Sequence, residues 1–233
     1  MSAADLRALH VPGRPLVLRN AWDAASAKAL ADGVPAIATT SVGVAETLGY
    51  ADGGHVPAAE AFAALARITA AVAVPVTHDS EAGYGLDPDT FVDGLLAAGG
   101  VGCNLEDTDH ATGGLRDSGE QARFLAAVRA AAGDRVVINA RVDVHLRGGT
   151  LEDGLERARA YRAAGADCVY PIFVQGEEAI AAYVEAAGVV NVNLGPNTLP
   201  VATLAALGVA RASFGAYLYK RSLAAAVAVA QAG

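Results

Sequence analysis

The sequence has few lysines and few cysteines, and each shortage disfavours a class of chemistry. Its two lysines, Lys28 and Lys220, both fall in segments with helical periodicity, whereas an aldolase that forms a Schiff base needs a desolvated lysine aimed at the substrate. The two cysteines, Cys103 and Cys168, lie inside apolar runs typical of strands, so we interpret them as buried thiols. No cluster of cysteine and histidine has the spacing of a zinc site. Imine formation and zinc binding are therefore disfavoured.

Basic runs and long apolar stretches are also absent, which narrows the expected partners. The 233 residues carry a net charge of −8, and without a basic run nucleic acid is not expected to bind. No apolar stretch reaches the roughly 18 residues of a membrane span. Residues 1–6 lack the basic and then apolar order of a signal peptide. We expect a cytoplasmic protein that binds neither membranes nor nucleic acid.

The sequence does contain a regular alternation of strand-like and helix-like segments, in a chain that is 53% hydrophobic and can support a large core. The expected strands are Leu16–Asn20, Ala36–Ser41, Pro75–Asp79, Gly102–Glu106, Val136–Asp143, Cys168–Phe173, Val189–Leu194 and Ala210–Gly215. The expected helices are Ala24–Asp32, Ala58–Val72, Pro88–Ala98, Gly119–Ala132, Leu151–Ala164, Glu177–Ala187, Val201–Leu207 and Tyr217–Gln231.

These strand–helix units predict an α/β fold of the (β/α)₈ TIM barrel type, because their number and the chain length both fit. A doubly wound open sheet shares the alternation. It usually has fewer units, and no G-x-G-x-x-G motif follows the first strand. We expect one domain over residues 1–233, with a short helix and loop at 1–15 and a final helix at 216–233.

Polar side chains gather at the predicted strand ends, where barrel enzymes have their active sites. Asp79 and Glu81 are two apart and are expected to face the same way. Glu106 ends the fourth strand. Other polar residues that share faces at strand ends are Thr39, Ser41, Asn139, Arg141, Asp143, Asn191 and Asn193.

Carboxylates that converge on one rim repel one another unless a cation neutralises them. Mg²⁺ prefers oxygen ligands and keeps several waters when few carboxylates bind it. We therefore predict a Mg²⁺ site at Asp79, Glu81 and Glu106, which Mn²⁺ could also occupy. The alternative is a set of solvated loop carboxylates beside helix N-termini, which favour negative charge.

Arg141 is the obvious cation for a substrate carboxylate, because its planar fork matches that group. It could also form a salt bridge with Glu106 or Asp143, and the two roles are compatible. His78 alternates away from the face of Asp79 and is expected to pack behind the barrel. His110 lies in the long loop after the fourth strand and could reach the site.

Sequence motifs also bear on two other reaction classes. No Gly-x-Ser-x-Gly elbow is present, which disfavours a serine hydrolase. The turns "NLGPNT" and "SFGAYL" after the last two strands are similar to the phosphate-binding corner of many barrels, although glycine also serves tight turns. They keep open a barrel isomerase that acts on a sugar phosphate, and a non-catalytic barrel is a further alternative.

Five segments together resemble the isocitrate lyase/phosphoenolpyruvate mutase superfamily, over nearly the whole chain. They are "NAWDAASAKAL" (20–30), "TTSVGVAETLGYADG" (39–53), "THDSEAGYG" (77–85), "CNLEDT" (103–108) and "NARVD" (139–143). The resemblance implies a Mg²⁺-dependent (β/α)₈ barrel that acts on a small 2-oxo acid through an enolpyruvate unit. It also implies that Asp79 binds the metal directly and that Glu81 and Glu106 hold the waters of the metal.

The resemblance assigns further site residues. Asp52 matches an aspartate near the reacting end of the substrate, and Arg141 matches the arginine that grips it. The remaining candidates for substrate binding are Trp22, Thr40, Ser41, Gly43 and Asn193. Thr40 and Ser41 match a segment whose backbone N–H groups bind the pyruvyl oxygens.

The loop at 107–120 departs from the family pattern. It reads "DTDHATGGLRDSGE" and has no cysteine, whereas isocitrate and methylisocitrate lyases carry a catalytic cysteine there. It also lacks the lysine and asparagine of the phosphonate branch. His110 and Arg116 are the loop side chains that could act as an acid or as an anion clamp.

We therefore predict a Mg²⁺-dependent lyase for a small carboxylate substrate, most similar to an oxaloacetate decarboxylase and not a true isocitrate lyase. Mutase or hydrolase activity on phosphonopyruvate is the alternative. The apolar final helix, "SLAAAVAVAQAG", favours a homo-oligomer, either a dimer or a tetramer.

Overall fold

In the computed structural model, which describes residues 2–232, eight parallel strands form a nearly closed barrel. These strands are β1 (Leu16–Ala21), β2 (Ile37–Thr39), β3 (Val76–Asp79), β4 (Gly102–Glu106), β7 (Val137–Val142), β8 (Cys168–Pro171), β9 (Asn191–Asn193) and β10 (Arg211–Ser213). They are hydrogen-bonded in the order β8-β7-β4-β3-β2-β1-β10-β9. A parallel bridge between Val169 and Val190 joins the two outer strands of this order. The predicted barrel is confirmed.

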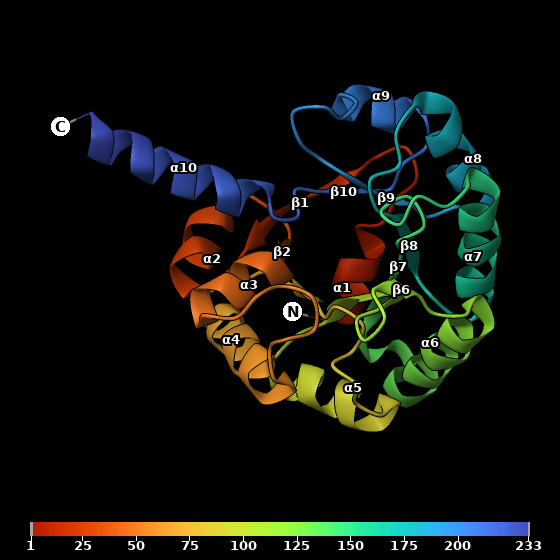
Figure 1. Ribbon diagram of the computed structural model, residues 1–233, viewed down its shortest axis with the longest axis horizontal. Helices are drawn as coiled ribbons and strands as arrows, with labels where there is room; N and C mark the ends of the chain where they lie inside the picture. Colours follow the sequence, from red (N-terminus) through yellow and green to blue (C-terminus); the bar gives the residue numbers. More distant parts are fainter. Residues whose placement is uncertain (1, 233) are drawn as a thin grey trace.

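Helices surround the strands, as Figure 1 shows from one end of the barrel. They are α2 (Ala24–Leu30), α3 (Ser41–Leu48), α4 (Ala58–Ala70), α5 (Pro88–Ala97), α6 (Ser118–Ala132), α7 (Leu151–Ala163), α8 (Glu177–Ala187), α9 (Val201–Ala206) and α10 (Tyr217–Gln231). Local sequence sets several of their starts. Asp23 and Asp87, for example, accept hydrogen bonds from the backbone N–H groups of Ser26 and Thr90, which satisfies N–H groups that have no partner within the helix.

Several short elements differ from the sequence prediction. The expected strand Ala36–Ser41 stops at Thr39, because α3 begins at Ser41. The loop after β4 contains a small antiparallel pair, β5 (Thr108–Asp109) and β6 (Gly114–Leu115). A 3₁₀ turn, η1 (Gly133–Arg135), follows α6.

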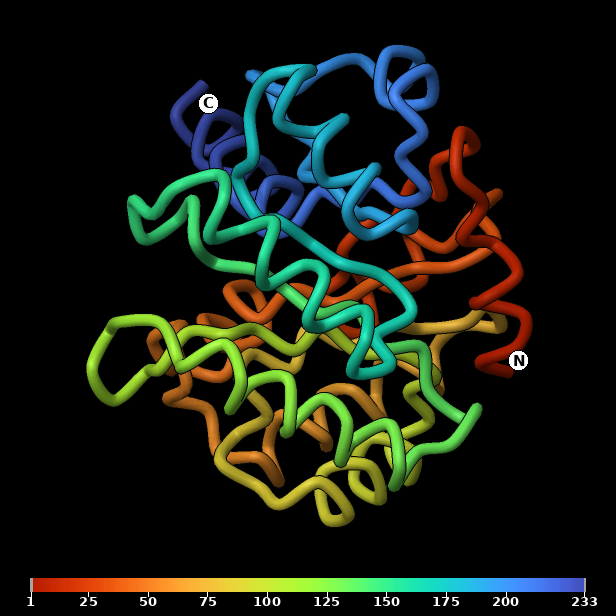
Figure 2. Tube along the Cα trace, turned by 90° about the vertical axis from the view of Figure 1, so that its right-hand side faces the viewer, coloured from red at the N-terminus to blue at the C-terminus, as the bar shows by residue number. Residues whose placement is uncertain are grey.

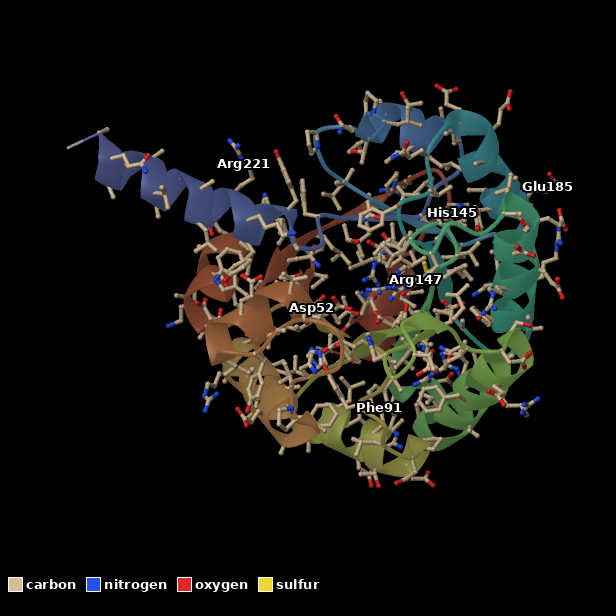
Figure 3. The ribbon with its side chains drawn as sticks, in the orientation of Figure 1. Asp52, Phe91, His145, Arg147, Glu185 and Arg221 are labelled. Carbon is tan, nitrogen blue, oxygen red and sulfur yellow. The ribbon has the colours of Figure 1, made fainter. Side chains whose placement is uncertain are left out.

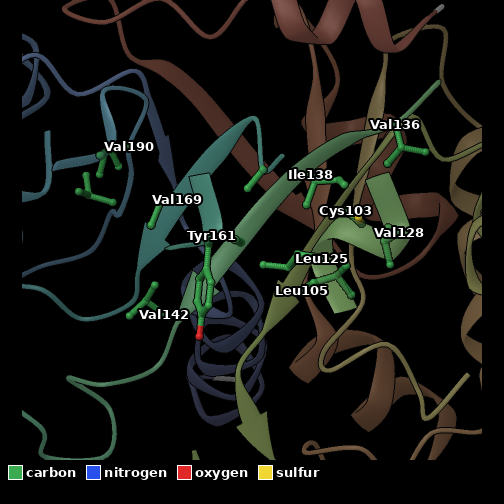
Figure 4. Packing of buried hydrophobic residues seen from close by; sticks show 14 of the residues in the cluster. Cys103, Leu105, Leu125, Val128, Val136, Ile138, Val142, Tyr161, Val169 and Val190 are labelled. Carbon is green, nitrogen blue, oxygen red and sulfur yellow. The ribbon is translucent and has the colours of Figure 1, made fainter. Parts of the chain in front are cut away.

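The outer faces of the strands form an apolar layer against the helices. Figure 4 shows this packing around β4 and β7, where Leu105 and Ile138 lie near Leu125 and Val128 of α6. All four side chains are fully buried. Each buried side chain of this size stabilises the fold by about 1.5–3 kcal/mol relative to exposure, so this layer holds the helices on the barrel.

The barrel interior is apolar at one end and polar at the other. α1 (Ala3–Ala8) covers the N-terminal end of the strands and inserts Leu6 there. Leu6 packs in a cluster with the interior side chains Leu16, Leu18, Ala36, Ala38 and Val137. The side view in Figure 2 shows α1 at one end and the loop after β4 at the opposite end. The N-terminal end is therefore closed, and a site can open only at the other end.

α10 projects away from the rest of the molecule (Figure 1). Only its first turns touch the barrel, where Tyr219 stacks edge-on against Trp22 with ring centroids 5.2 Å apart. From Lys220 onward its described residues are exposed. Residues 1 and 233, at the ends of the predicted segments 1–15 and 216–233, lie outside the described residues.

Across residues 2–232, no helix combines the length and the apolar character that crossing a membrane requires.

Candidate active site

The carboxyl end of β3 places Asp79 at the centre of the polar end of the barrel. One carboxylate oxygen, Oδ2, accepts a hydrogen bond from the backbone N–H of Ser41 at 3.0 Å. Ser41 is the first residue of α3, so the positive end of that helix faces the carboxylate. The other oxygen, Oδ1, lies 3.4 Å from the side-chain amide of Asn104 on β4.

Glu81 joins this site through an unusual backbone conformation. β3 ends at Asp79, and Glu81 has a φ of 47°, in the left-handed region that residues with side chains rarely adopt. Its carboxylate is 3% exposed and accepts a hydrogen bond from the backbone N–H of Gly54. Strained backbone of this kind clusters at functional sites.

Glu106, at the end of β4, is held between two cationic side chains. Its Oε2 lies 2.5 Å from Nη2 of Arg141, and its Oε1 lies 2.8 Å from Nε2 of His110. The same His110 nitrogen is 3.8 Å from Oε2 of Glu81. Arg141 also forms a two-point contact with Asp143, at 2.6 and 2.8 Å. Arg141 therefore forms both of the salt bridges that the sequence suggested.

Burial, together with like charges, raises the pKa values of this group. Burial, and then the like charges of Asp52, Asp79 and Glu106, raise the pKa of Glu81 to about 7 despite its bond from Gly54. Burial also raises the pKa of Glu106, against the opposing effect of Arg141. Asp52 lies at the exposed rim, where partial desolvation and the charge of Asp79 raise its pKa. Perturbed carboxylates in one place are typical of functional sites.

The histidine of the loop after β4 also titrates abnormally. The close contact with the Glu106 carboxylate raises the pKa of His110, although partial burial acts in the opposite direction. The loop that carries Asp52 closes against this histidine, because a Cβ at Gly54 would lie 3.0 Å from the His110 ring. Two loops thus meet above the carboxylates. Figure 3 shows Asp52 and Arg147 over the middle of the ring and Glu185 and Arg221 at its outside.

The donor chemistry of this group fits a hydrated Mg²⁺. Within residues 2–232, no three His, Cys, Asp or Glu side chains are grouped so that all could ligate one ion directly. One direct carboxylate ligand with waters bridging to two others does not require such a group. The three carboxylates offer only oxygen ligands, and a cation would relieve the like-charge repulsion that adds to burial in raising the pKa of Glu81. Asp79, Glu81 and Glu106 thus fit the predicted role.

Some predicted site residues lie apart from this group. Arg116 donates to Oε1 of Gln121 at 3.3 Å, and its guanidinium lies 5.9 Å from the ring centre of Phe124 on α6. Trp22 contacts Tyr219, as described above, and a Cβ at Gly43 would meet Trp22 at 2.7 Å. Gly43 therefore allows α3 to pack closely beside Trp22.

Asn193 and the glycine-rich turns serve local structure in this conformation. Asn193 accepts a hydrogen bond from the backbone N–H of Phe173 at 2.9 Å and donates to Tyr170 at 2.6 Å. The backbone N–H of Gly195 donates to Thr198, and that of Gly215 donates to Asn20. These N–H groups are engaged within the protein, which does not favour the phosphate-binding alternative.

Sequence reasoning missed Asn104 and Gly54. Asn104 is two residues before Glu106 on the same strand, so strand alternation places both on the inner face. That signal was available. The hydrogen bond from Gly54 to Glu81 joins residues far apart in the sequence, and no local sequence pattern predicts it.

The fold and the site define an α/β barrel with an acidic rim, and comparison with known proteins places this barrel in a family. The sequence model of the phosphoenolpyruvate phosphomutase family matches residues 6–232. The chain belongs to this family. The resemblance to the isocitrate lyase/phosphoenolpyruvate mutase superfamily is confirmed.

Individual relatives include proteins with and without a stated activity. A crystal structure of a candidate phosphonomutase from Burkholderia cenocepacia J2315 superposes with a TM-score of 0.92 and 41% identity, over 99% of both chains. An uncharacterized protein of Mycobacterium tuberculosis (strain ATCC 25618 / H37Rv) is 36% identical over 96% of this chain and 86% of its own.

Two relatives carry names that state a reaction. The 2,3-dimethylmalate lyase of Eubacterium barkeri is 31% identical over 76% of this chain and 65% of its own. An oxaloacetate decarboxylase of Rhodopseudomonas palustris (strain BisA53) is 35% identical over 45% of this chain and 39% of its own. The family thus contains lyases and mutases, which supports an enzymatic role for this chain.

Proposed function

We propose that this protein is a Mg²⁺-dependent lyase that cleaves a carbon–carbon bond in a small 2-oxo or 2-hydroxy acid and passes through an enolpyruvate-like state. Decarboxylation of oxaloacetate is the first candidate reaction. The observation that carries the proposal is the convergence of Asp79, Glu81 and Glu106 beside Arg141 at the open end of the barrel. The 2,3-dimethylmalate lyase and the oxaloacetate decarboxylase support the same bond type.

Asp79 would hold the metal directly, and Glu81 and Glu106 would hold its waters. When bound, Mg²⁺ would act as a Lewis acid toward the oxygen that gains charge as the bond breaks. Glu81 must lose its proton to accept hydrogen bonds from such waters. Its pKa of about 7 in the metal-free protein means that metal binding would release protons near neutral pH.

The remaining residues of the site bind and orient the acid. Arg141 would grip a substrate carboxylate with its planar fork, and Asp143, which is fully buried, holds the guanidinium in place. The positive start of α3 at Ser41 would stabilise developing negative charge, while the N–H groups of Thr40 and Ser41 themselves donate to Ala21 and Asp79. Orientation of this kind removes much of the entropic cost of reaching the transition state.

Proton transfer would fall to Asp52 and His110. Asp52 stands at the rim with a raised pKa, so it can hold a proton near neutral pH more readily than an ordinary aspartate. His110 is held by Glu106, which raises its pKa and favours its charged form. In a decarboxylation CO2 leaves as a neutral molecule and the enolate keeps the electron pair, so the charged form would donate a proton to the enolate carbon.

Chemistry at a carbon–phosphorus bond is the second candidate. Its support is the candidate phosphonomutase, which is 41% identical over 99% of both chains. The loop after β4 lacks the lysine and asparagine expected of the phosphonate branch, so we place this reaction second.

A homo-oligomer is also proposed, as a dimer or tetramer assembled through α10. Leu223, Val227 and Val229 of this helix are 48%, 55% and 76% exposed, and exposed aliphatic side chains gathered on one helix mark an interaction surface. Light scattering after size-exclusion chromatography tests this. The double variant Leu223→Lys/Val227→Lys should shift the mass toward the monomer, and a wild-type protein that is monomeric at the highest concentration tested would refute it.

A substrate screen tests the proposed reaction. Oxaloacetate, 2,3-dimethylmalate, other substituted malates, methylisocitrate and phosphonopyruvate would each be incubated with Mg²⁺ or with EDTA. We expect Mg²⁺-dependent turnover of a 2-oxo or 2-hydroxy acid and thermal protection by oxalate, an enolate mimic. Turnover of none of these acids, together with protection by sugar phosphates alone, would reject the proposal in favour of the isomerase class.

A further inference from the structure

Arg211 is a fully buried cation inside the barrel, and it has no acidic partner. It lies on β10 with none of its surface exposed. Among residues 2–232 no carboxylate lies within salt-bridge distance of it, and its Nε and Nη1 atoms have no hydrogen-bond partner in the protein. Burying a charge in this way is costly, and an apolar residue of similar size would avoid that cost. Its presence therefore calls for a role other than stability.

The guanidinium crosses the barrel to reach one particular side chain. β10 and β4 are four places apart in the strand order in either direction around the ring, so they face each other across the lumen. Nη2 of Arg211 nevertheless donates to Oδ1 of Asn104 on β4, at 3.2 Å. The same oxygen accepts a second hydrogen bond from the amide of Asn139, at 2.8 Å.

These contacts fix which way the Asn104 amide points. A guanidinium can only donate, so the amide oxygen must face Arg211, and the amide nitrogen must face the other way. That nitrogen lies 3.4 Å from Oδ1 of Asp79, and an ionised carboxylate can only accept. One orientation of the Asn104 amide therefore satisfies both Arg211 and Asp79. The reversed orientation would lose the hydrogen bond from Arg211 and the contact with Asp79.

We propose that Arg211 is a positioning residue that acts through Asn104 to hold Asp79 in the orientation needed for metal binding. The Ser41 N–H holds the second oxygen of Asp79 at 3.0 Å, so each carboxylate oxygen receives one hydrogen bond from the protein. The carboxylate cannot rotate freely, and each oxygen retains lone-pair capacity for a cation. This inference rests on the proposed Mg²⁺ site and extends it to a residue on the opposite wall of the barrel.

Arg211→Met distinguishes positioning from the two simpler roles of a buried arginine. Positioning predicts that the Kd for Mg²⁺, measured by titration calorimetry, rises about tenfold, within the range seen for groups that orient metal ligands. Electrostatic repulsion alone predicts the opposite, a lower Kd, because a positive charge near the metal is removed. A purely structural role predicts a lower melting temperature and an unchanged Kd. We expect the melting temperature of the metal-free variant to stay equal or rise.

Asn104→Leu and Ser213→Ala complete the experiment. Asn104→Leu removes the amide that links Arg211 to Asp79 and keeps a side chain of similar size, so it should raise the Kd for Mg²⁺ by the same factor as Arg211→Met. The double variant should have a Kd no higher than that of either single variant. Ser213 is two residues from Arg211 and pairs with Asn191, so Ser213→Ala is the matched control with unchanged Kd. If Arg211→Met fails to fold, Asn104→Leu and its control still decide the question.

The outcomes separate this inference from the proposed function. If wild-type protein shows no binding of Mg²⁺, both are overturned. If the wild type binds Mg²⁺ and both variants bind it within twofold of the wild type, only the positioning role fails. A metal-free crystal structure gives a second readout, since Asp79 should keep one orientation in the wild type and adopt more than one in Asn104→Leu.

Discussion

The two ends of the barrel interior are built from opposite chemistry. At the N-terminal end, Leu6 of α1 packs among aliphatic side chains of the strands. At the other end, Asp79, Glu81 and Glu106 gather beside Arg141. The apolar end needs no partner beyond the protein, whereas the acidic end carries repulsion that a cation would relieve. Substitutions at the first end should therefore lower stability, whereas those at the second should lower activity without lowering the stability of the metal-free protein.

The largest expected effect is that of Asp79→Asn. It removes the charge of the one carboxylate that we expect to bind the metal directly, while the amide keeps the shape of the side chain. We expect kcat/KM to fall by about 10²–10³-fold and the thermal stabilisation by Mg²⁺ to disappear. The unfolding free energy in EDTA should change little. A variant that keeps at least a third of wild-type kcat/KM would show that Asp79 is not the ligand.

At the opposite end, Leu6→Ala should act on stability alone. Leu6 is fully buried, and truncating a buried leucine typically costs about 2–5 kcal/mol. We expect a loss of about 3 kcal/mol in the free energy of unfolding by urea, with kcat/KM within twofold of the wild type. A large loss of activity at a temperature where the variant is folded would mean that the two ends are coupled.

Glu81→Gln should raise the free energy of unfolding of the metal-free protein, whereas most substitutions lower it. The pKa of Glu81 is raised from 4.5 to about 7, so this group contributes stability below pH 4.5 that is lost as the pH rises through 7. Glutamine carries no charge and so avoids this loss of stability. At pH 8 without metal we expect its free energy of unfolding to exceed that of the wild type by about 1–3 kcal/mol. The gain should shrink as the pH falls through 7 and vanish only below pH 4.5. A pH-independent difference between the two proteins would contradict the assignment of this pKa.

The smallest expected changes in kcat/KM are those of two residues in the loop after β4, and they differ between the two. His110 contacts Glu106, so His110→Ala should lower kcat/KM by about tenfold. Arg116 packs over Phe124, so Arg116→Ala should stay within twofold of the wild type unless the loop rearranges around substrate. If the double variant keeps full kcat/KM, the loop serves only as a cover.

Much of the fold could be predicted because barrel strands leave a strong local signal. Runs such as Val137–Val142 are apolar on their outer face and end in polar residues, and short glycine-rich turns separate them from helices. α3 was missed because its segment, "SVGVAETL", follows β2 directly, without a turn to mark the change. The pair β5 and β6 is only two residues long on each side, which is too short for any periodicity to be visible.

The site was predictable in composition but not in its contacts. Alternation placed Arg141 and Asp143 on one face, and their ion pair follows from it. Glu81 meets the other carboxylates for a different reason than alternation, because the strand has ended and its φ is 47°. The contacts of Arg116 with Phe124, Trp22 with Tyr219 and Arg211 with Asn104 depend on how distant segments pack. Local sequence does not encode such contacts.

The most direct test of the central claim is a crystal structure of the protein grown with Mg²⁺ and oxalate. Our account predicts one metal ion bound directly by Asp79, with waters bridging it to Glu81 and Glu106, and oxalate within reach of Arg141. A structure in which Glu106 remains paired with Arg141 and His110, and no metal lies beside Asp79, would contradict it.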